Sequence, residues 1–169
     1  MTFLKILLGV LAALAAAAAL WWLAMYRPAK LLEAQQADAA VARANLQQER
    51  EAMFGADALS SEVQWRETGL GYHILSEGTG PKPGVGTRVR MNYLGRLREG
   101  TIFDQSKQPV DFAVGQMVPG MNAAVMMLGA GGKGVFFIPP TLGYGRRAVG
   151  PIPANAGLIF EIELVAVNP

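Results

Sequence analysis

The stretch TRVRMNYLGRLR, residues 87–98, decides the fold class of this chain, because its side chains change character at every second position. Val89, Met91 and Tyr93 alternate with polar residues, which is the pattern of a strand that buries one face. The stretch GLIFEIELVAV, residues 157–167, repeats this alternation with glutamates on its polar face. The two stretches therefore predict long strands of an antiparallel sheet with one buried side.

Three shorter strands and one helix are expected before and between these two strands. The strands are GYHILSE at 71–77, VDFAVG at 110–115 and GVFFIPP at 134–140. The helix is Met121–Leu128, and Gly129 closes it. Glycines and prolines mark every junction. The expected architecture is therefore α+β, with an antiparallel sheet wrapped around one short helix.

The N-terminal segment differs in composition from the rest of the chain. Residues 6–25 are ILLGVLAALAAAAALWWLAM, twenty residues without a charge, which in a helix span about 30 Å, the thickness of a bilayer's hydrocarbon core. Trp21 and Trp22 lie at one end of this run, where aromatic rings favour the headgroup layer, and Pro28 marks a break. Residues 1–27 are therefore expected to form a single-pass transmembrane signal anchor.

Two alternatives stay open for this segment. It is either a retained anchor in the inner membrane, or a signal peptide with Lys5 in its basic region that is cleaved after Ala19 and releases the protein to the periplasm. The flanking charges alone, with Arg27 and Lys30 on the C-terminal side, slightly favour a cytoplasmic domain. The similarity of the short N-terminal region to an export signal favours a domain that faces the periplasm, and this is the orientation we predict.

Residues 28–61 are predicted to form a helical stalk and a linker. From Lys30 to Phe54 the chain is rich in Ala, Gln, Glu and Arg and has no Gly or Pro, which favours a helix. Apolar residues recur every seven positions at Leu32, Ala39, Leu46 and Met53. The stalk is either a solvated spacer or, if this stripe pairs with a second copy, the site of a homodimer. The globular domain is expected to cover residues 62–169.

The residue inventory argues against several classes of chemistry. The chain has no cysteine and one histidine, His73, which stands alone in a strand pattern, so we expect neither a thiol nucleophile nor a metal site. The segment GAGGKG at 129–134 matches a dinucleotide-binding pattern, but a helix precedes it and a strand follows it, the reverse of the order that binds phosphate. We interpret it as a turn and expect no cofactor. The formal net charge of +2 gives little support for a nucleic-acid partner.

Five segments occur in an order that identifies a family. They are GLGYHILSEGTGPKP, VRMNYLGRLREGTIFDQS, FAVGQMVPGM, IPPTLGYG and GPIPANAGLIFEIEL. Together they resemble an FKBP-type peptidyl-prolyl cis-trans isomerase over residues 70–167. The resemblance implies a five- to six-stranded antiparallel sheet curled around a short helix, with a shallow apolar pocket that takes a proline ring. It also implies proline-containing polypeptides as partners and macrolides as candidate inhibitors.

The resemblance assigns five catalytic positions. Tyr93 matches the tyrosine of the family's YxG strand motif, and Phe103 and Asp104 match its FD pair. Tyr144 matches the tyrosine of the YG motif, whose hydroxyl binds a substrate carbonyl, and Phe160 matches a wall residue of the last strand. Taken singly, Tyr93 and Phe160 are better explained as ordinary core residues, so their assignment depends on the ordered set of motifs.

Five further positions are assigned to substrate binding. Met117 and Val118 match the two residues before the helix, where the backbone N–H of Val118 would bind another substrate carbonyl, and Ile152 matches a wall residue of the last loop. Two positions depart from the family: Met121 stands where a tryptophan often forms the pocket floor, and Val110 stands where animal members carry an aromatic ring. These departures keep open a weakly active or inactive FKBP-like chaperone or peptide-binding module.

The expected mechanism needs no nucleophile. An X–Pro bond rotates over a barrier of about 18–20 kcal/mol. The twisted transition state is less polar than the planar amide, so an apolar pocket that excludes water stabilises it preferentially. Two roles are open for Asp104. It holds Tyr93 or another donor by a charge-assisted hydrogen bond, or it places a negative field near the rotating carbonyl. The sequence favours the hydrogen bond but does not decide between the two roles.

Overall fold

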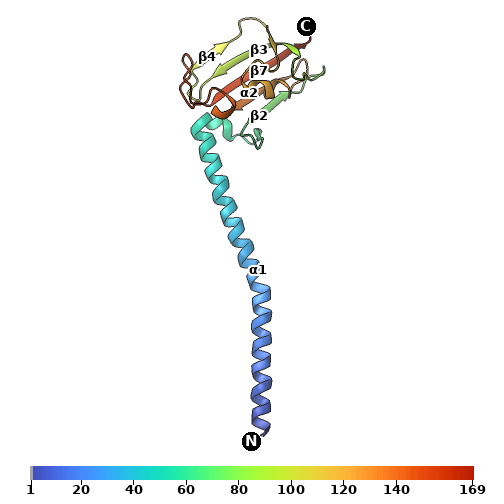
Figure 1. Ribbon diagram of the computed structural model, residues 1–169, viewed down its shortest axis with the longest axis vertical. Helices are drawn as coiled ribbons and strands as arrows, with labels where there is room; N and C mark the ends of the chain where they lie inside the picture. The colour runs from blue at the N-terminus through green and yellow to red at the C-terminus, as the bar shows by residue number, and fades with distance from the viewer. Residues whose placement is uncertain (1) are drawn as a thin grey trace. The chain divides into compact units, whose positions relative to one another are not determined.

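The computed structural model describes the backbone of residues 2–169 and the side chains of residues 14–26 and 29–169. The chain divides into two compact units, Met1–Leu46 and Gln47–Pro169. Figure 1 shows that the described part of the first unit is helical, whereas the second unit contains the strands.

One long helix, α1 (Thr2–Phe54), runs through the first unit and ends in the second. The helix predicted for residues 30–54 is confirmed, and Gly55 follows it with φ of 80° and ψ of −172°, an extended backbone of positive φ that glycine adopts without strain and that cannot continue the helix. The helix continues through Pro28, so the break predicted there is wrong. A proline inside a helix removes one backbone donor and crowds the carbonyl four residues earlier, which can bend a helix without ending it, and here the backbone is helical on both sides.

The membrane anchor predicted for residues 1–27 stays a prediction. Within the described residues, no helix is both long enough and apolar enough to cross a bilayer. The first part of the predicted apolar run, residues 6–13, falls outside the side chains that the structure describes.

The second unit is built on one antiparallel sheet of seven strands. The strands are β1 (Gln64–Trp65), β2 (Gly71–Ser76), β3 (Arg88–Arg96), β4 (Ile102–Gln105), β5 (Val110–Ala113), β6 (Lys133–Ile138) and β7 (Leu158–Val167). Their order across the sheet is β1-β2-β6-β7-β3-β4, and β5 also pairs with β3. The α+β class is confirmed, but the expected five to six strands are too few, because the two-residue β1 is too short for side-chain alternation to reveal it.

The short helix α2 (Pro119–Val125) begins two residues before the predicted start and ends three residues before the predicted end. Pro119 suits the first helical position, where the backbone N–H needs no helical partner. After Val125 the N–H groups of Met127 and Leu128 donate to carbonyls three residues earlier, so the chain tightens into turns. The turn predicted at residues 129–134 is confirmed at residues 130–131, whereas Lys133 and Gly134 already belong to β6. Two 3₁₀ helices, η1 (Ala56–Leu59) and η2 (Pro140–Leu142), complete the unit.

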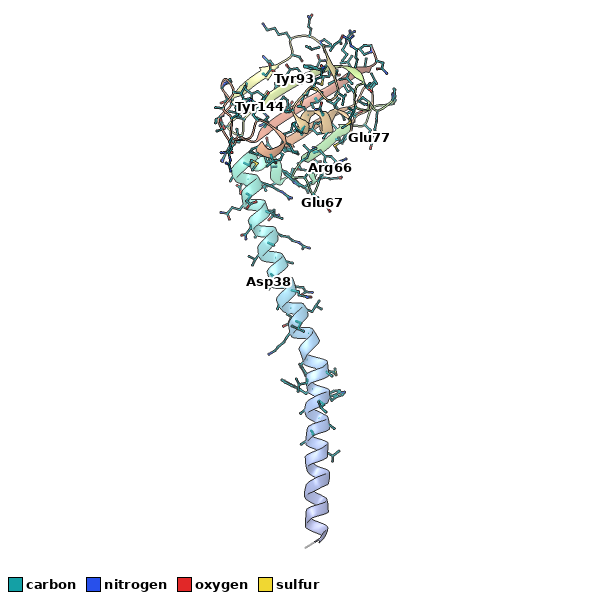
Figure 2. All side chains as sticks on the ribbon, viewed as in Figure 1. Asp38, Arg66, Glu67, Glu77, Tyr93 and Tyr144 are labelled. Carbon is teal, nitrogen blue, oxygen red and sulfur yellow. The ribbon has the colours of Figure 1, made fainter. Side chains whose placement is uncertain are left out.

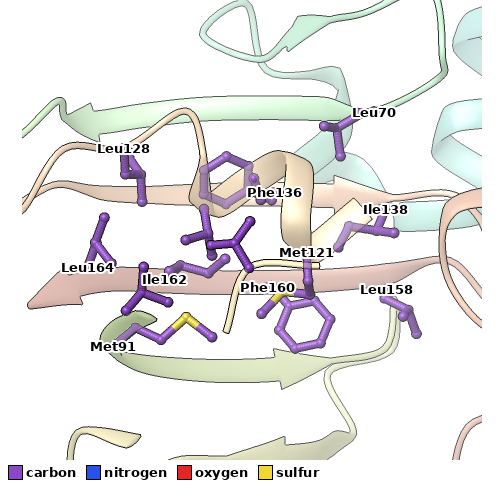
Figure 3. Close-up of a cluster of buried hydrophobic side chains, with 14 of the residues drawn as sticks. Leu70, Met91, Met121, Leu128, Phe136, Ile138, Leu158, Phe160, Ile162 and Leu164 are labelled. Atoms are coloured by element: carbon purple, nitrogen blue, oxygen red, sulfur yellow. The ribbon is translucent and has the colours of Figure 1, made fainter. Parts of the chain in front are cut away.

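The main hydrophobic core lies between the sheet and α2. The alternation predicted for β7 is confirmed, because Leu158, Phe160, Ile162 and Leu164 are all buried in this core together with residues of α2. Figure 3 shows Met121 of α2 beside the ring of Phe160 within this cluster. The sheet therefore curls around the helix as expected, and α2 covers one of its faces.

A second, smaller core lies on the opposite face of the sheet. Phe54, at the end of α1, packs edge-to-face on Phe137 of β6 at 5.6 Å between ring centroids, and Ile159 of β7 is buried beside them. The guanidinium of Arg50 lies 4.2 Å above the ring of Trp65, which packs against the same cluster. The last turns of α1 are thus part of the globular unit, which the sequence did not predict.

Candidate active site

Strands β3, β4 and β7 bring three aromatic side chains together. The rings of Phe103 and Phe160 meet edge-to-face at 5.4 Å, and the ring of Tyr93 lies 6.3 Å from that of Phe160. Gly95 of β3 pairs with both β4 and β7 beneath these rings. A Cβ atom at Gly95 would lie 2.6 Å from Phe103 and 2.8 Å from Phe160, so only glycine lets the two rings converge here.

Asp104 holds the phenol of Tyr93. The Tyr93 hydroxyl donates a hydrogen bond of 2.9 Å to Oδ2 of Asp104. The pKa of Tyr93 is raised to about 12. The largest cause is burial of the phenol, followed by this hydrogen bond and then by the negative charges of Asp104 and ionised Tyr144. The phenol is therefore protonated at neutral pH, and the hydrogen bond required by the first of the two roles considered for Asp104 is present.

Two neighbours of Tyr93 were not predicted from the sequence. Ser106 accepts a hydrogen bond of 2.9 Å from the backbone N–H of Tyr93, and its own N–H donates to the Tyr93 carbonyl at 3.0 Å. Phe112 of β5 packs edge-to-face on the Tyr93 ring at 5.9 Å. The alternation in VDFA was the only sequence signal for Phe112, and Ser106 gave none, because its role depends on how β3 and β4 pair.

The loop before α2 is held by a side chain that sequence reasoning also missed. The amide of Asn122 donates to the carbonyl of Met117 and accepts from the N–H of Gly115, both at 2.7 Å. Val118 precedes the first helical residue, so its N–H lies outside the hydrogen bonds of the helix. Met117 and Val118 pack against the main core, and Met121 is buried in it, so these three predicted positions lie together.

The remaining predicted residues lie on the loop before β7 and on β5. Ile152 is buried in the main core and pairs with Val149 through two backbone hydrogen bonds of 3.0 Å. Tyr144 is 37% exposed, and Figure 2 shows it in the same region of the globular unit as Tyr93. Val110 is also 37% exposed and lies at the outer strand β5, so it adds little to an enclosed wall.

The structure therefore gathers most, but not all, of the predicted site. Seven positions share the main core: Tyr93, Phe103, Met117, Val118, Met121, Ile152 and Phe160. Tyr144 and Asp104 lie at its exposed margin, whereas Val110 is not part of it. Of the predicted site residues, Tyr93 alone lines one of the hollows described by the structure, and no such hollow brings it together with Phe103, Val118 or Tyr144, so the proline pocket stays a prediction.

The described side chains form no cluster of three or more His, Asp or Glu residues that would suit a metal ion. His73, the one histidine, lies with Nε2 3.6 Å from a carboxylate oxygen of Glu62, on the β2 side of the sheet. The polar groups available at the aromatic cluster are thus a carboxylate, two phenols and backbone N–H groups, which suit binding and orientation more than covalent chemistry.

The raised pKa of Tyr93 predicts a loss of stability at high pH. Because the pKa in the folded protein is about 12, above the ordinary value of 10.0, the associated stabilisation is fully present below pH 10 and disappears as the pH rises towards 12. We expect the free energy of unfolding, measured with denaturant, to fall more steeply over this interval in the wild type than in Tyr93→Phe. Val165→Ala, which removes an exposed side chain that does not titrate, is the control and should keep the wild-type slope; equal slopes in wild type and Tyr93→Phe would contradict the assignment.

Comparison with known proteins gives the family. A family model described as FKBP-type peptidyl-prolyl cis-trans isomerase matches residues 80–165. The chain is 37% identical over 143 residues to the FKBP-type peptidyl-prolyl cis-trans isomerase FkpA of Aeromonas hydrophila, covering 83% of this chain and 53% of the relative. It is 42% identical over 105 residues to the Outer membrane protein MIP of Legionella longbeachae, covering 60% and 45%. The chain spans about half the length of these curated relatives.

Solved structures agree with this result. FkpA from Escherichia coli superposes with a TM-score of 0.66 at 29% identity, covering 98% of this chain and 81% of that structure. A peptidyl-prolyl cis-trans isomerase from Pseudomonas syringae gives a TM-score of 0.65 at 33% identity, covering 74% and 95%. The matched family model spans the strands and the helix that carry the aromatic cluster. This chain belongs to the FKBP-type peptidyl-prolyl cis-trans isomerase family.

Proposed function

We propose that this chain is a peptidyl-prolyl cis-trans isomerase that accelerates rotation about X–Pro bonds in proline-containing polypeptides of the exported proteome. The observation that carries the proposal is the convergence of Phe103, Phe160 and Tyr93 with Asp104, in a chain of this family. The site binds the substrate without a covalent step, and its apolar surroundings favour rotation about the X–Pro bond.

The proline ring is placed against the edge-to-face pair of Phe103 and Phe160, with the thioether of Met121 beside it. The backbone N–H of Val118 and the hydroxyl of Tyr144 bind substrate carbonyls on either side. Contact with these apolar groups removes water from the X–Pro bond and favours the twisted, less polar transition state. Each 1.36 kcal/mol of this preference accelerates rotation about tenfold.

Asp104 acts in this scheme through Tyr93. The charge-assisted hydrogen bond fixes the phenol of Tyr93, while the carboxylate of Asp104 stays exposed. The alternative role of the same carboxylate is to place a negative field near the rotating carbonyl.

The experiment that tests the function is turnover of a Leu-Pro peptide in a protease-coupled assay. We expect Asp104→Asn to lower kcat/KM several-fold, because an amide is a weaker acceptor for Tyr93 and carries no charge, while the thermal midpoint stays near that of the wild type. Asp111→Asn is the matched control: Asp111 is also a hydrogen-bonded carboxylate, 2.7 Å from Nε of Arg90, but belongs to a surface ion pair. Undiminished activity of Asp104→Asn would contradict the role.

A second function, a binding module with little turnover, is favoured by two features of the same site. Met121 supplies a flexible thioether where a rigid ring often forms the pocket floor, and Val110 is 37% exposed and leaves one wall open. Wild-type protein that binds the Leu-Pro peptide without accelerating its isomerisation would support this function over the first. Macrolide binding, measured in the same titration, tests how complete the pocket is.

The N-terminal segment is proposed to place this activity at the inner membrane. Residues 1–27 serve as the single-pass anchor, residues 28–61 as the stalk, and residues 62–169 as the isomerase domain facing the periplasm. Cell fractionation with N-terminal sequencing tests the anchor: a mature chain that begins near Leu20 would mean cleavage and release instead. Sedimentation of a chain that begins at Lys30 tests the homodimer, since a monomeric mass would exclude pairing through the stalk.

A further inference from the structure

Strand β2 has an outer edge that the chain covers only in part. Strand β1 pairs with β2 at two positions, Gln64 with Tyr72 and Trp65 with Gly71. Before Gln64 the chain forms a turn instead of extending β1. On this side of β2, no strand among residues 2–169 pairs with His73–Ser76. The outer edge of β2 therefore extends beyond the two residues that pair with β1.

The alternation of antiparallel pairing fixes which backbone groups face this edge. The hairpin between β1 and β2 is closed by the N–H of Arg66, which donates to the carbonyl of Leu70 at 2.9 Å. Residues two positions apart point to the same side of a strand, so Leu70, Tyr72 and Ile74 all direct their N–H and C=O groups to the side of β1. Those of Ile74 lie beyond the end of β1, ready to pair with an extended chain.

A hollow of about 620 Å³ lies along this edge. Its lining includes residues 72–77, which are consecutive residues of β2 and its continuation. Met126 and Met127, which follow the end of α2, also line it. Figure 2 labels Arg66 and Glu77 near the ends of β2, at the border of the sheet. The hollow thus lies where a strand would lie beside β2, and the regular part of this edge ends at Ile74, after which the pairing of β2 with β6 shifts register.

The charges of the hollow favour an uncharged occupant. Nζ of Lys82 lies 3.8 Å from Glu77, and the lining holds one further acidic residue, Glu62, and one further basic residue, Arg66, so its formal charges balance with His73 neutral. Met126 and Met127 are partly exposed and pack on the main core. Their flexible thioethers adapt to apolar side chains of different shape. A chain with small, uncharged, alternating residues complements this lining.

We propose that the β2 edge is a second binding site, which takes an extended, uncharged segment of unfolded polypeptide by adding it to the sheet as a strand. Backbone hydrogen bonds to Ile74 supply the affinity, and alternate side chains lie on Met126 and Met127. The seven-residue α2 separates this edge from Val118 and is about 10 Å long. Roughly three extended residues cover that length, so one unfolded chain can lie on this edge and present a proline to the other site. The binding site itself does not depend on isomerisation.

The test uses the full chain, labelled for amide NMR, and a proline-free probe: an acetylated and amidated peptide of four Val-Thr repeats between two lysines. We expect the amide signals of Ile74 and Met127 to shift saturably and hydrogen exchange at Ile74 to slow at least tenfold. A peptide with the same side chains and every backbone nitrogen methylated should bind at least tenfold more weakly. Equal binding of the two peptides, or no shift at Ile74, overturns the proposal.

Two variants control for the role of the side chains. Met127→Gln should weaken binding of the probe several-fold, whereas Leu59→Gln, which changes a partly exposed leucine outside the hollow, should not. Ile74 shifts that depend on protein concentration in the absence of peptide would mean that a second copy of this chain occupies the edge, and would also overturn the proposal. Absence of turnover on Leu-Pro peptides would contradict only the isomerase function, since the proline-free probe reports on the edge alone.

Discussion

Replacing Phe160 by alanine is expected to remove most of the isomerase activity and to lower the thermal midpoint by roughly 10–20 °C. The side chain is 5% exposed and contacts the rings of Phe103 and Tyr93, so its removal leaves a cavity under the whole aromatic cluster. Loss of a buried phenylalanine costs about 3–5 kcal/mol. Calorimetry gives the midpoint, and the protease-coupled assay, run well below it, gives the activity of the folded fraction.

Two further variants separate the ring from the fold. Val165→Ala removes an apolar side chain from the same strand at a position that is 40% exposed, and it should leave both midpoint and activity near the wild-type values. Phe160→Leu fills most of the volume without a ring, so it should lose more activity than stability. A midpoint of Phe160→Ala within one or two degrees of the wild type would show that the ring is not buried as the structure has it.

Removing residues 47–54 is expected to destabilise the globular unit by about 3–5 kcal/mol relative to a chain that begins at Gln47. Phe54 is 2% exposed and packs on Phe137, and the guanidinium of Arg98 donates to the carbonyl of Ala52. A Cβ atom at Gly157 would lie 2.6 Å from Met53, so the helix end closely approaches the loop before β7. The free energy of unfolding of the two chains, from denaturant titrations, measures the difference.

The chain that begins at Gln47 is expected to match the full chain in stability, because residues 1–46 form a separate compact unit. Phe54→Ala in the full chain should reproduce most of the loss, which assigns it to one side chain and not to the shortened helix. If chains beginning at Gln47 and at Gly55 unfold at the same denaturant concentration, the second core contributes nothing and α1 ends outside the globular unit.

The sequence alone was sufficient for the fold class and for the family. Strands β3 and β7 show a period of two that holds without their partners, because solvent on one side and the core on the other select the side chains position by position. Seven of the positions named by the ordered motifs pack in one core, while their roles in substrate binding and catalysis stay predictions. These features are local, and a local pattern can be recognised from the sequence alone.

Only the tertiary structure decided which residues support that cluster. Ser106 and Asn122 act through hydrogen bonds to Tyr93 and to the Gly115–Met117 loop, and no spacing rule predicts such partners. The same holds for Phe54, which completes a core with residues more than eighty positions away, and for Ile74, whose exposed edge exists because β1 stops after two residues. The sequence determined what each segment prefers by itself, whereas contacts between distant segments depend on the free energy of the whole packed unit and became visible only in three dimensions.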